Sequence, residues 1–166
     1  MADTIRELII QEFIARAAVI RTAGSPPLYA TDIGATVLRA RPKVAPAELP
    51  CTVIWPQPEE AENAHGMVQH WMPIRVEGLA LFEAENPSLV AERILGDLVK
   101  CFTSPAWDRR RPVAGSPVIY LSPYAESIIY QGGGTDEYPE DGAVSVASSA
   151  HFRITYWTVA GDPCSQ

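Results

Sequence analysis

The stretch A-V-S-V-A-S-S-A-H-F-R-I-T-Y-W-T-V, residues 143–159, decides how this chain folds. Its apolar residues Val146, Phe152 and Ile154 fall on one parity, whereas His151 and Arg153 fall on the other together with Ser145, Ser149, Thr155 and Trp157. Alternation with a period of two predicts a β-strand with one buried face. Extended over its full length the strand would span roughly 56 Å, more than the width of about 40 Å of a compact domain of this size. The strand therefore either bends, which the small residues at 147–150 would permit, or extends beyond the body of the domain.

Two helices are predicted on either side of the middle of the chain. Thr4 and Glu7 have the spacing of a capping box, and the apolar residues that follow recur at helical intervals to about Thr22. Asn86 followed by Pro87 starts a second amphipathic helix, which ends before Pro105. The residues expected to form the core between helices and sheet are Ile5, Ile9, Phe13, Ile94, Leu98, Phe102, Phe152 and Ile154.

Further strands are expected at residues 35–41, 49–55, 68–82, 118–121 and 127–131, with Gly78 as a bulge or bend in the third of them. The polar residues 57–67 are interpreted as an exposed hairpin loop, and the Gly-rich, then acidic residues 131–142 as a long, flexible one. Both helices need a sheet face to cover. The sequence therefore predicts a single α+β domain, residues 1–166, with a mixed, mainly antiparallel sheet, two helices on one face, and long hairpins extending from the body.

Composition excludes several classes of protein. The net charge of −7 opposes tight binding to a phosphate backbone, and no apolar run approaches the ~18 residues of a membrane span. The first residues lack the pattern of a signal peptide, so we expect a soluble protein in the cytoplasm of the cell that makes it, without a membrane partner. Cys51 and Cys101 are expected to be buried thiols, because their spacing fits neither a disulfide framework nor a metal motif.

No residue pattern supports catalysis or a cofactor. The three histidines, His65, His70 and His151, lack metal-ligand spacing and are interpreted as surface residues. Gly132 to Gly134 are not followed by the lysine of a P-loop and are interpreted as a flexible turn. We therefore expect a protein that is not an enzyme and binds no metal or cofactor.

Two charged segments are the candidate interaction sites. Arg109, Arg110 and Arg111, preceded by Asp108, could bind an acidic partner through their guanidinium groups, although a merely solvated loop fits equally well. The second segment contains four carboxylates whose spacing is not that of a calcium loop, so a solvated loop is the default there. Its acidic residues are Asp136, Glu137, Glu140 and Asp141.

Four stretches resemble the tail terminator proteins of long-tailed bacteriophages, minor tail proteins that cap the finished tail tube and join it to the head. They are R-E-L-I-I-Q-E-F-I-A-R-A-A-V-I, T-D-I-G-A-T-V-L-R-A-R-P-K-V, L-P-C-T-V-I-W-P and Y-Q-G-G-G-T-D-E-Y-P-E-D-G-A. The resemblance implies an α+β fold and a ring, most simply a homohexamer, whose lumen passes DNA as cargo. It also implies a tail tube protein and a head–tail connector protein as partners. The expected location is then the virion tail, assembled in the host cytoplasm.

Other functions stay open at this point. A head–tail completion protein or a tail tube subunit would share the size and the ring, and a binding module outside a virion would be a monomer or dimer with an apolar patch on one face. A small hydrolase would need a polar pocket with a perturbed acid or base. Within a ring, six copies of three arginines would retard sliding DNA, so Arg109 to Arg111 are predicted to face a protein neighbour. The 136–141 segment is predicted to face the lumen or the docking surface.

Overall fold

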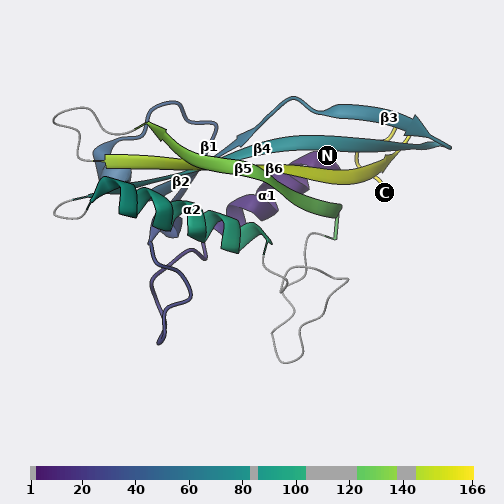
Figure 1. Ribbon diagram of the computed structural model, residues 1–166. Helices are drawn as coiled ribbons and strands as arrows, with labels where there is room; N and C mark the ends of the chain where they lie inside the picture. Colours follow the sequence, from purple (N-terminus) through teal and green to yellow (C-terminus); the bar gives the residue numbers. More distant parts are fainter. Residues whose placement is uncertain (1–2, 83–85, 104–122, 138–144) are drawn as a thin grey trace.

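A computed structural model describes residues 3–82, 86–103, 123–137 and 145–166, with side chains as far as Thr135 in the third range. In these ranges, two helices lie on one face of a six-stranded sheet (Figure 1). The elements follow one another in the order α1 (Ile5–Ala17), β1 (Thr36–Arg39), β2 (Cys51–Pro56), β3 (Glu60–Ala64), β4 (Met67–Leu81), α2 (Pro87–Thr103), β5 (Ala125–Glu137) and β6 (Ser145–Val159), with short 3-10 turns at Ile33–Ala35 and Pro46–Glu48. The predicted α+β class is confirmed.

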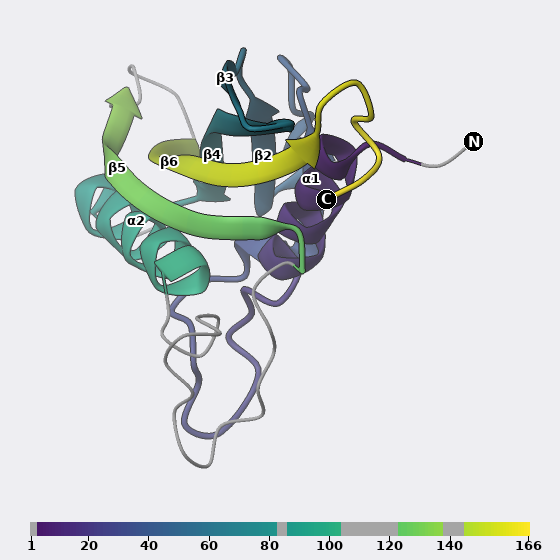
Figure 2. The same ribbon diagram turned by 90° about the vertical axis from the view of Figure 1, so that its right-hand side faces the viewer.

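The sheet is mixed and mainly antiparallel, as predicted. Its strand order is β1-β2-β4-β6-β5, and β3 pairs with the part of β4 that β2 does not reach. Among the described strands, only β1 and β2 run parallel; the other pairs are antiparallel. Both α1 and α2 cover the same face, which Figure 2 shows in a view along the strands. We call the opposite face the outer face.

The long strands β4 and β6 form the axis of the molecule. Each has 15 residues, and they pair without interruption from Met67 opposite Val159 to Leu81 opposite Ser145. The predicted terminal strand is thus confirmed. Of the two alternatives for a strand of this length, the structure shows extension beyond the body: β4 and β6 continue past α2 together with β3 (Figure 1). We call this end, made of β3, Met67–Trp71 and Thr155–Val159, the arm.

The helices begin as the sequence predicts. The side chain of Thr4 accepts a hydrogen bond of 3.2 Å from the Glu7 amide, and the side chain of Asn86 accepts one of 2.9 Å from the Ser88 amide. α1 ends at Ala17, five residues before the predicted Thr22, because the chain turns there into a loop that Asp32 ties back through Thr22. α2 ends at Thr103, as expected from Pro105.

The core lies between the helices and the inward-facing residues of β4 and β6. All eight residues predicted for it are buried, and the rings of Phe13 and Phe102 stack with their centroids 4.6 Å apart. Phe152 meets both rings from the sheet side. Cys51 and Cys101 are buried free thiols, as predicted.

Three predictions about the strands were wrong. Residues 57–67 are not only a loop, since Glu60–Ala64 form β3 and pair with β4. Residues 131–137 are not part of a loop either: β5 continues to Glu137, with Gly132 to Gly134 paired opposite His151, Ala150 and Ser149. Gly78 forms no bulge, because it keeps the regular register opposite Thr52 and Ser148. A Cβ at Gly78 would lie 2.5 Å from Cγ2 of Ile94, so the glycine lets α2 approach the sheet.

Candidate interaction surface

The outer face of the sheet carries aromatic and charged side chains in its middle and along the arm. Odd-numbered residues of β4 point to this side, and Trp71, Pro73 and Arg75 are each half-buried there. From the neighbouring strand β6 come His151 and Arg153, both exposed, in register with Arg75 and Pro73. Aromatic residues and arginine are both enriched at protein–protein interfaces.

Ile129 adds apolar surface next to Arg153. The two residues are register partners on β5 and β6, and the side chain of Ile129 is 44% exposed. Trp157 lies further along β6, and its Nε1 donates a hydrogen bond of 2.8 Å to Oε2 of Glu126. Within the described residues no helix covers this part of the sheet.

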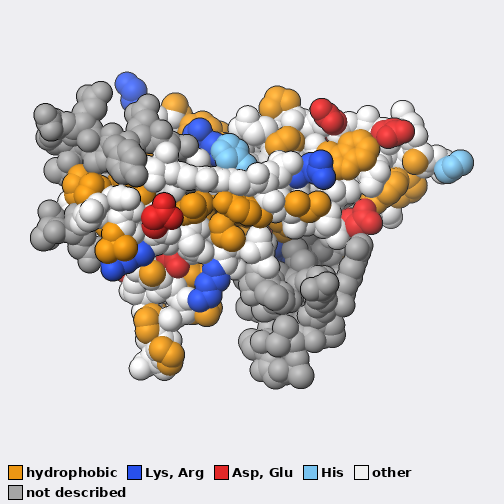
Figure 3. All heavy atoms as spheres, viewed as in Figure 1, with side chains coloured by type: hydrophobic (Ala, Val, Ile, Leu, Met, Phe, Trp, Pro, Cys, Tyr) orange, Lys and Arg blue, Asp and Glu red, His pale blue; other side chains and the backbone are white. Residues whose placement is uncertain are grey.

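Charge is distributed unevenly over the outer face. Glu60 and Glu62 of β3 are exposed and lie in register with Trp71 and Gln69, so they share the outer side of the arm. Arg153 and His151 lie across β4 from them. The space-filling view looks onto the β5 edge of the sheet: basic side chains and a histidine lie over the middle of the long strands, and acidic side chains lie toward the end that carries β3, where another histidine forms the tip (Figure 3).

Some of these groups are fixed within the chain. The guanidinium of Arg75 lies 5.3 Å from the ring centroid of Trp55, and its Nη2 is 3.2 Å from Oε2 of Glu77. Nε1 of Trp55 donates a hydrogen bond of 3.1 Å to the same carboxylate oxygen. This stacked arrangement orients Arg75 and pairs its guanidinium with a carboxylate. By contrast, no ion pair among the described residues involves Arg153, Glu60 or Glu62.

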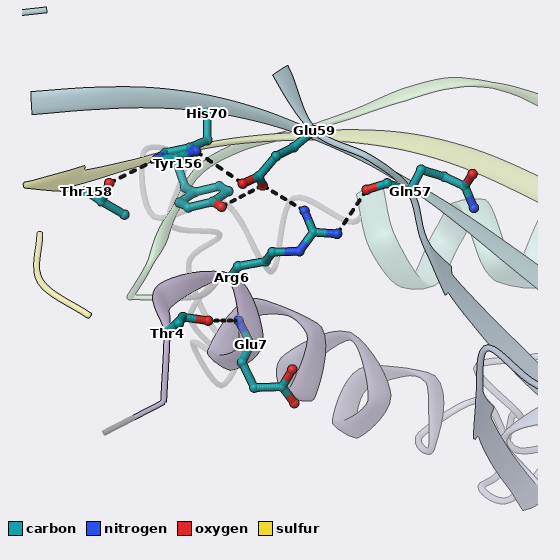
Figure 4. Close-up of polar contacts among 8 residues, drawn as sticks. All are labelled: Thr4, Arg6, Glu7, Gln57, Glu59, His70, Tyr156 and Thr158. Atoms are coloured by element: carbon teal, nitrogen blue, oxygen red, sulfur yellow. Dashed lines mark hydrogen bonds and ion pairs between the residues drawn. The ribbon is translucent and has the colours of Figure 1, made fainter. Parts of the chain in front are cut away.

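On the inner side, a polar cluster connects the arm to α1; we call Arg6, Glu59, His70 and Tyr156 the arm joint (Figure 4). The Tyr156 hydroxyl and Nη1 of Arg6 both donate to Oε2 of Glu59, at 2.7 and 2.8 Å. The imidazole of His70 stacks on the Tyr156 ring at 4.5 Å, and its Nδ1 lies 3.4 Å from Oε1 of Glu59. Four segments of the chain thus meet at one carboxylate.

The electrostatics of the arm joint follow from burial. Tyr156 is 2% exposed, and this burial, followed by the hydrogen bond to Glu59, raises the pKa of its phenol above the ordinary value. The phenol therefore remains a neutral donor. Arg6 also donates to the carbonyl of Gln57 at 2.9 Å, so its guanidinium spans the connection between β2 and β3. The predicted surface position of His70 was wrong, because its side chain is 15% exposed and packed on Tyr156.

A second polar cluster fixes the loop between α1 and β1. Asp97 of α2 is 5% exposed, and its carboxylate accepts hydrogen bonds from the amides of Ala30 and Thr31 and from the Thr31 hydroxyl, at 2.7 to 3.0 Å. Lys100 donates to the carbonyl of Leu28, whose side chain is 60% exposed. The buried carboxylate of Asp97 thus accepts hydrogen bonds from groups within the chain, and its role is structural.

Metal binding has no support in the described ranges. No group of three or more His, Cys, Asp and Glu side chains there could coordinate an ion. The histidines lie apart, with His65 in the turn between β3 and β4, His70 in the arm joint and His151 on the outer face. Nor is any helix in these ranges long and apolar enough to cross a membrane.

The structure does not bring the predicted site residues together. Asp108, Arg109, Arg110, Arg111, Glu140 and Asp141 lie outside the described residues. Asp136 and Glu137 are the last two residues of β5. Glu137 pairs with Ala147, Asp136 lies at a register shift, and the side chains of both are likewise outside the description. The prediction of an acidic loop tethered by mobile glycines was wrong for Gly132 to Gly134. Gly133 is instead required by packing, because a Cβ there would lie 2.3 Å from the carbonyl oxygen of Ser149.

Sequence reasoning missed the arm joint and the charges of β3. Glu59, Glu60 and Glu62 stand in a polar run whose composition is typical of a loop. The alternation E-A-E at 60–62 is the one feature of the sequence that indicates a strand there. Because its inward residue is only an alanine, a search for alternating hydrophobic residues does not detect this strand. A scan of protein-family models and a search of curated proteins each found no match to this chain.

Proposed function

We propose that this chain is a structural protein of a bacteriophage tail, which caps the finished tail tube as a ring of six copies and provides the surface that joins the head. Two things support the proposal. The sequence stretches at 6–20, 31–44, 49–56 and 130–143 resemble tail terminator proteins. The fold has the α+β arrangement, with helices on a sheet, that this resemblance implies.

The structural feature that most supports this proposal is the arm. A sheet whose long strands continue past its helices, anchored to α1 through Glu59, extends surface well beyond the body of the domain. Such an extension can contact a neighbour in a closed assembly while the core remains intact. Identical head-to-tail contacts close into a ring when the rotation between copies allows it. The net charge of −7 suits a channel through which DNA must slide without being retained.

The partners in this proposal are the tail tube protein, the head–tail connector protein and further copies of the chain. Arg109, Arg110 and Arg111 are assigned to a protein neighbour, because guanidinium groups bind carboxylates bidentately and fix orientation. The 136–141 segment is assigned to the lumen or the docking surface. The protein would act without a metal or cofactor and would not be an enzyme.

The proposal is tested by adding the purified protein to growing tail tubes of the phage that encodes it. A terminator binds one end of each tube and stops its elongation. A tube subunit would instead add along the length, and a completion protein would require the head before it binds. Replacing Arg109, Arg110 and Arg111 together by Ala should abolish binding to the tube end without changing the melting temperature.

A second candidate, a binding module outside a virion, is favoured by one observation. The outer face presents Trp71, Trp157 and Ile129 without a covering element among the described residues. Such a module would bind its partner through this face and would leave tail tubes unaffected. Substitutions on the outer face and at 109–111 therefore separate the two candidates.

A further inference from the structure

Unpaired charges of opposite sign lie on the two sides of β4 on the outer face. Arg153 of β6 is exposed and makes neither a hydrogen bond nor an ion pair within the described part of the chain, although Arg6, Arg39, Arg41 and Arg75 all do. Glu60 and Glu62 of β3 are equally exposed and enter no ion pair in those ranges. Within the described residues, these charges are therefore not neutralised by other side chains, and they lie on one face of the sheet.

The strand register gives this arrangement a symmetry. Arg153 is the register partner of Pro73, and Glu60 is the register partner of Trp71, two residues away along β4. Neighbouring strands lie about 4.8 Å apart, so the basic and acidic residues lie at similar distances on opposite sides of β4. A two-fold rotation about an axis along β4 exchanges these sides. Arg153 of one copy then faces Glu60 of a second copy, and the same contact occurs twice.

Apolar surface lies between and beside these charges. Trp71 and Pro73 lie near the rotation axis, and Ile129, which is 44% exposed, flanks Arg153. Two sheets pack face to face about 10 Å apart, a distance that such side chains fill. The alternative of edge-to-edge pairing is disfavoured, because β5 carries three register irregularities, β3 carries two exposed glutamates and the edge strand β1 has only 4 residues.

We propose that the free protein forms a two-fold pair in which the outer faces of two copies pack together, with Arg153 of each copy opposite Glu60 of the other. The inference rests on the outer face alone and goes beyond the proposed function. A cap with one end toward the tube and the other toward the head needs a ring in which all copies point the same way along the tail axis, whereas the two copies of a two-fold pair point in opposite directions across their outer faces. The pair is therefore the form before assembly, and it separates when copies assemble on the tail.

The test is the mass of the protein in solution, measured by light scattering and sedimentation at tens of micromolar. The parent chain should have twice the 18.1 kDa mass of one copy. Arg153→Glu and Glu60→Arg should each raise the dimer dissociation constant at least about tenfold, because like charges then face one another. The double variant with both reversals should recover the parent constant, since opposite charges again face each other across the axis.

Arg21→Glu is the matched control for Arg153→Glu, since Arg21 is an exposed arginine on the loop after α1 and the net charge changes equally. It should leave the dissociation constant unchanged. Far-ultraviolet circular dichroism and the melting temperature verify that each variant is folded. A parent chain that is monomeric at these concentrations overturns the pair, as does failure of the double variant to recover. A parent of six copies also overturns the pair while supporting the proposed ring, so the two proposals fail separately.

Discussion

The phenolic hydroxyl of Tyr156 donates a hydrogen bond of 2.7 Å to Oε2 of Glu59, a residue 97 positions away in the sequence. This bond fixes the terminal strand to the junction between β2 and β3. Arg6 donates to the same oxygen from α1, so the orientation of the arm relative to the helices depends on one carboxylate. Removing a donor leaves the partly buried Glu59 with less compensation for its lost hydration.

Tyr156→Phe should therefore lower the free energy of unfolding by about 1–3 kcal/mol, the cost of removing a hydrogen bond to a charged group. Urea denaturation followed by circular dichroism measures this difference. Tyr130→Phe is the control, because Tyr130 packs against Phe152 through its ring and its hydroxyl makes no hydrogen bond among the described residues. Equal losses in the two variants would show that the bond to Glu59 contributes nothing.

The glycines of β5 offer a second matched pair. Gly133→Ala places a Cβ 2.3 Å from the Ser149 carbonyl oxygen and 2.9 Å from Cδ1 of Leu95, whereas a Cβ at Gly134 has no heavy atom within 4 Å. We expect Gly133→Ala to cost about 1–3 kcal/mol of unfolding free energy and Gly134→Ala to be close to neutral. If both substitutions were tolerated equally in thermal unfolding, the 131–137 segment would be a loop after all.

Truncation of the core should be costly where α2 meets the sheet. Leu98 is fully buried and Leu89 on the same helix is 49% exposed. Leu98→Ala should lower the unfolding free energy by about 2–5 kcal/mol, and Leu89→Ala should change it by less than about 0.5 kcal/mol. A loss at Leu98 no larger than the loss at Leu89 would place the wrong side of α2 against the sheet.

The three thiols should differ in reactivity. Burial raises the pKa of Cys101 to about 12 and that of Cys51 to about 11, whereas Cys164 is only partly buried. Because the thiolate is the nucleophile, alkylation of the folded protein at pH 8 should modify Cys164 well before the other two. Mass spectrometry of timed samples identifies the modified residue. Modification of Cys101 at the rate of Cys164 would contradict its burial.

The same pKa shifts predict a loss of stability in alkali. A thiol whose pKa is higher in the folded than in the unfolded chain contributes stability that is fully present below the unfolded value near 9. That contribution is lost as the pH rises from about 9 toward 12. Cys101→Ser would remove the thiol's part of this dependence, so its denaturation midpoint should fall less steeply between pH 9 and 10.5 than that of the parent. Identical slopes would contradict the shift.

The sequence predicts a strand well when the strand's own residues alternate, and poorly when the strand forms only because it pairs with a neighbour. β6 alternates between apolar and polar residues from Ala150 to Tyr156, so parity alone separates Phe152 and Ile154 from the outward-facing Arg153. β3 carries Glu60 and Glu62 on its outer side and no large apolar residue on its inner side, and it becomes a strand by pairing with β4. Propensity also argues against Gly132 to Gly134 in a strand, yet close packing against Ser149 and Leu95 selects glycine at Gly133.

The candidate site was less predictable for a similar reason. The arm joint brings together residues 6, 59, 70 and 156, and no local pattern connects them. The opposed charges of Arg153 and Glu60 become visible only when both strands are in register with β4. Periodicity identifies which side of a strand is buried, but it does not identify the strand that lies next to it.

Electron cryomicroscopy of intact virions at the junction between tail and head would show directly whether six copies of this chain cap the tail tube. We expect one ring of six copies of this chain between the last tube layer and the connector, with the helices and sheet fitting the density of each copy. Copies stacked along the whole tube, or a junction that contains none, would contradict it.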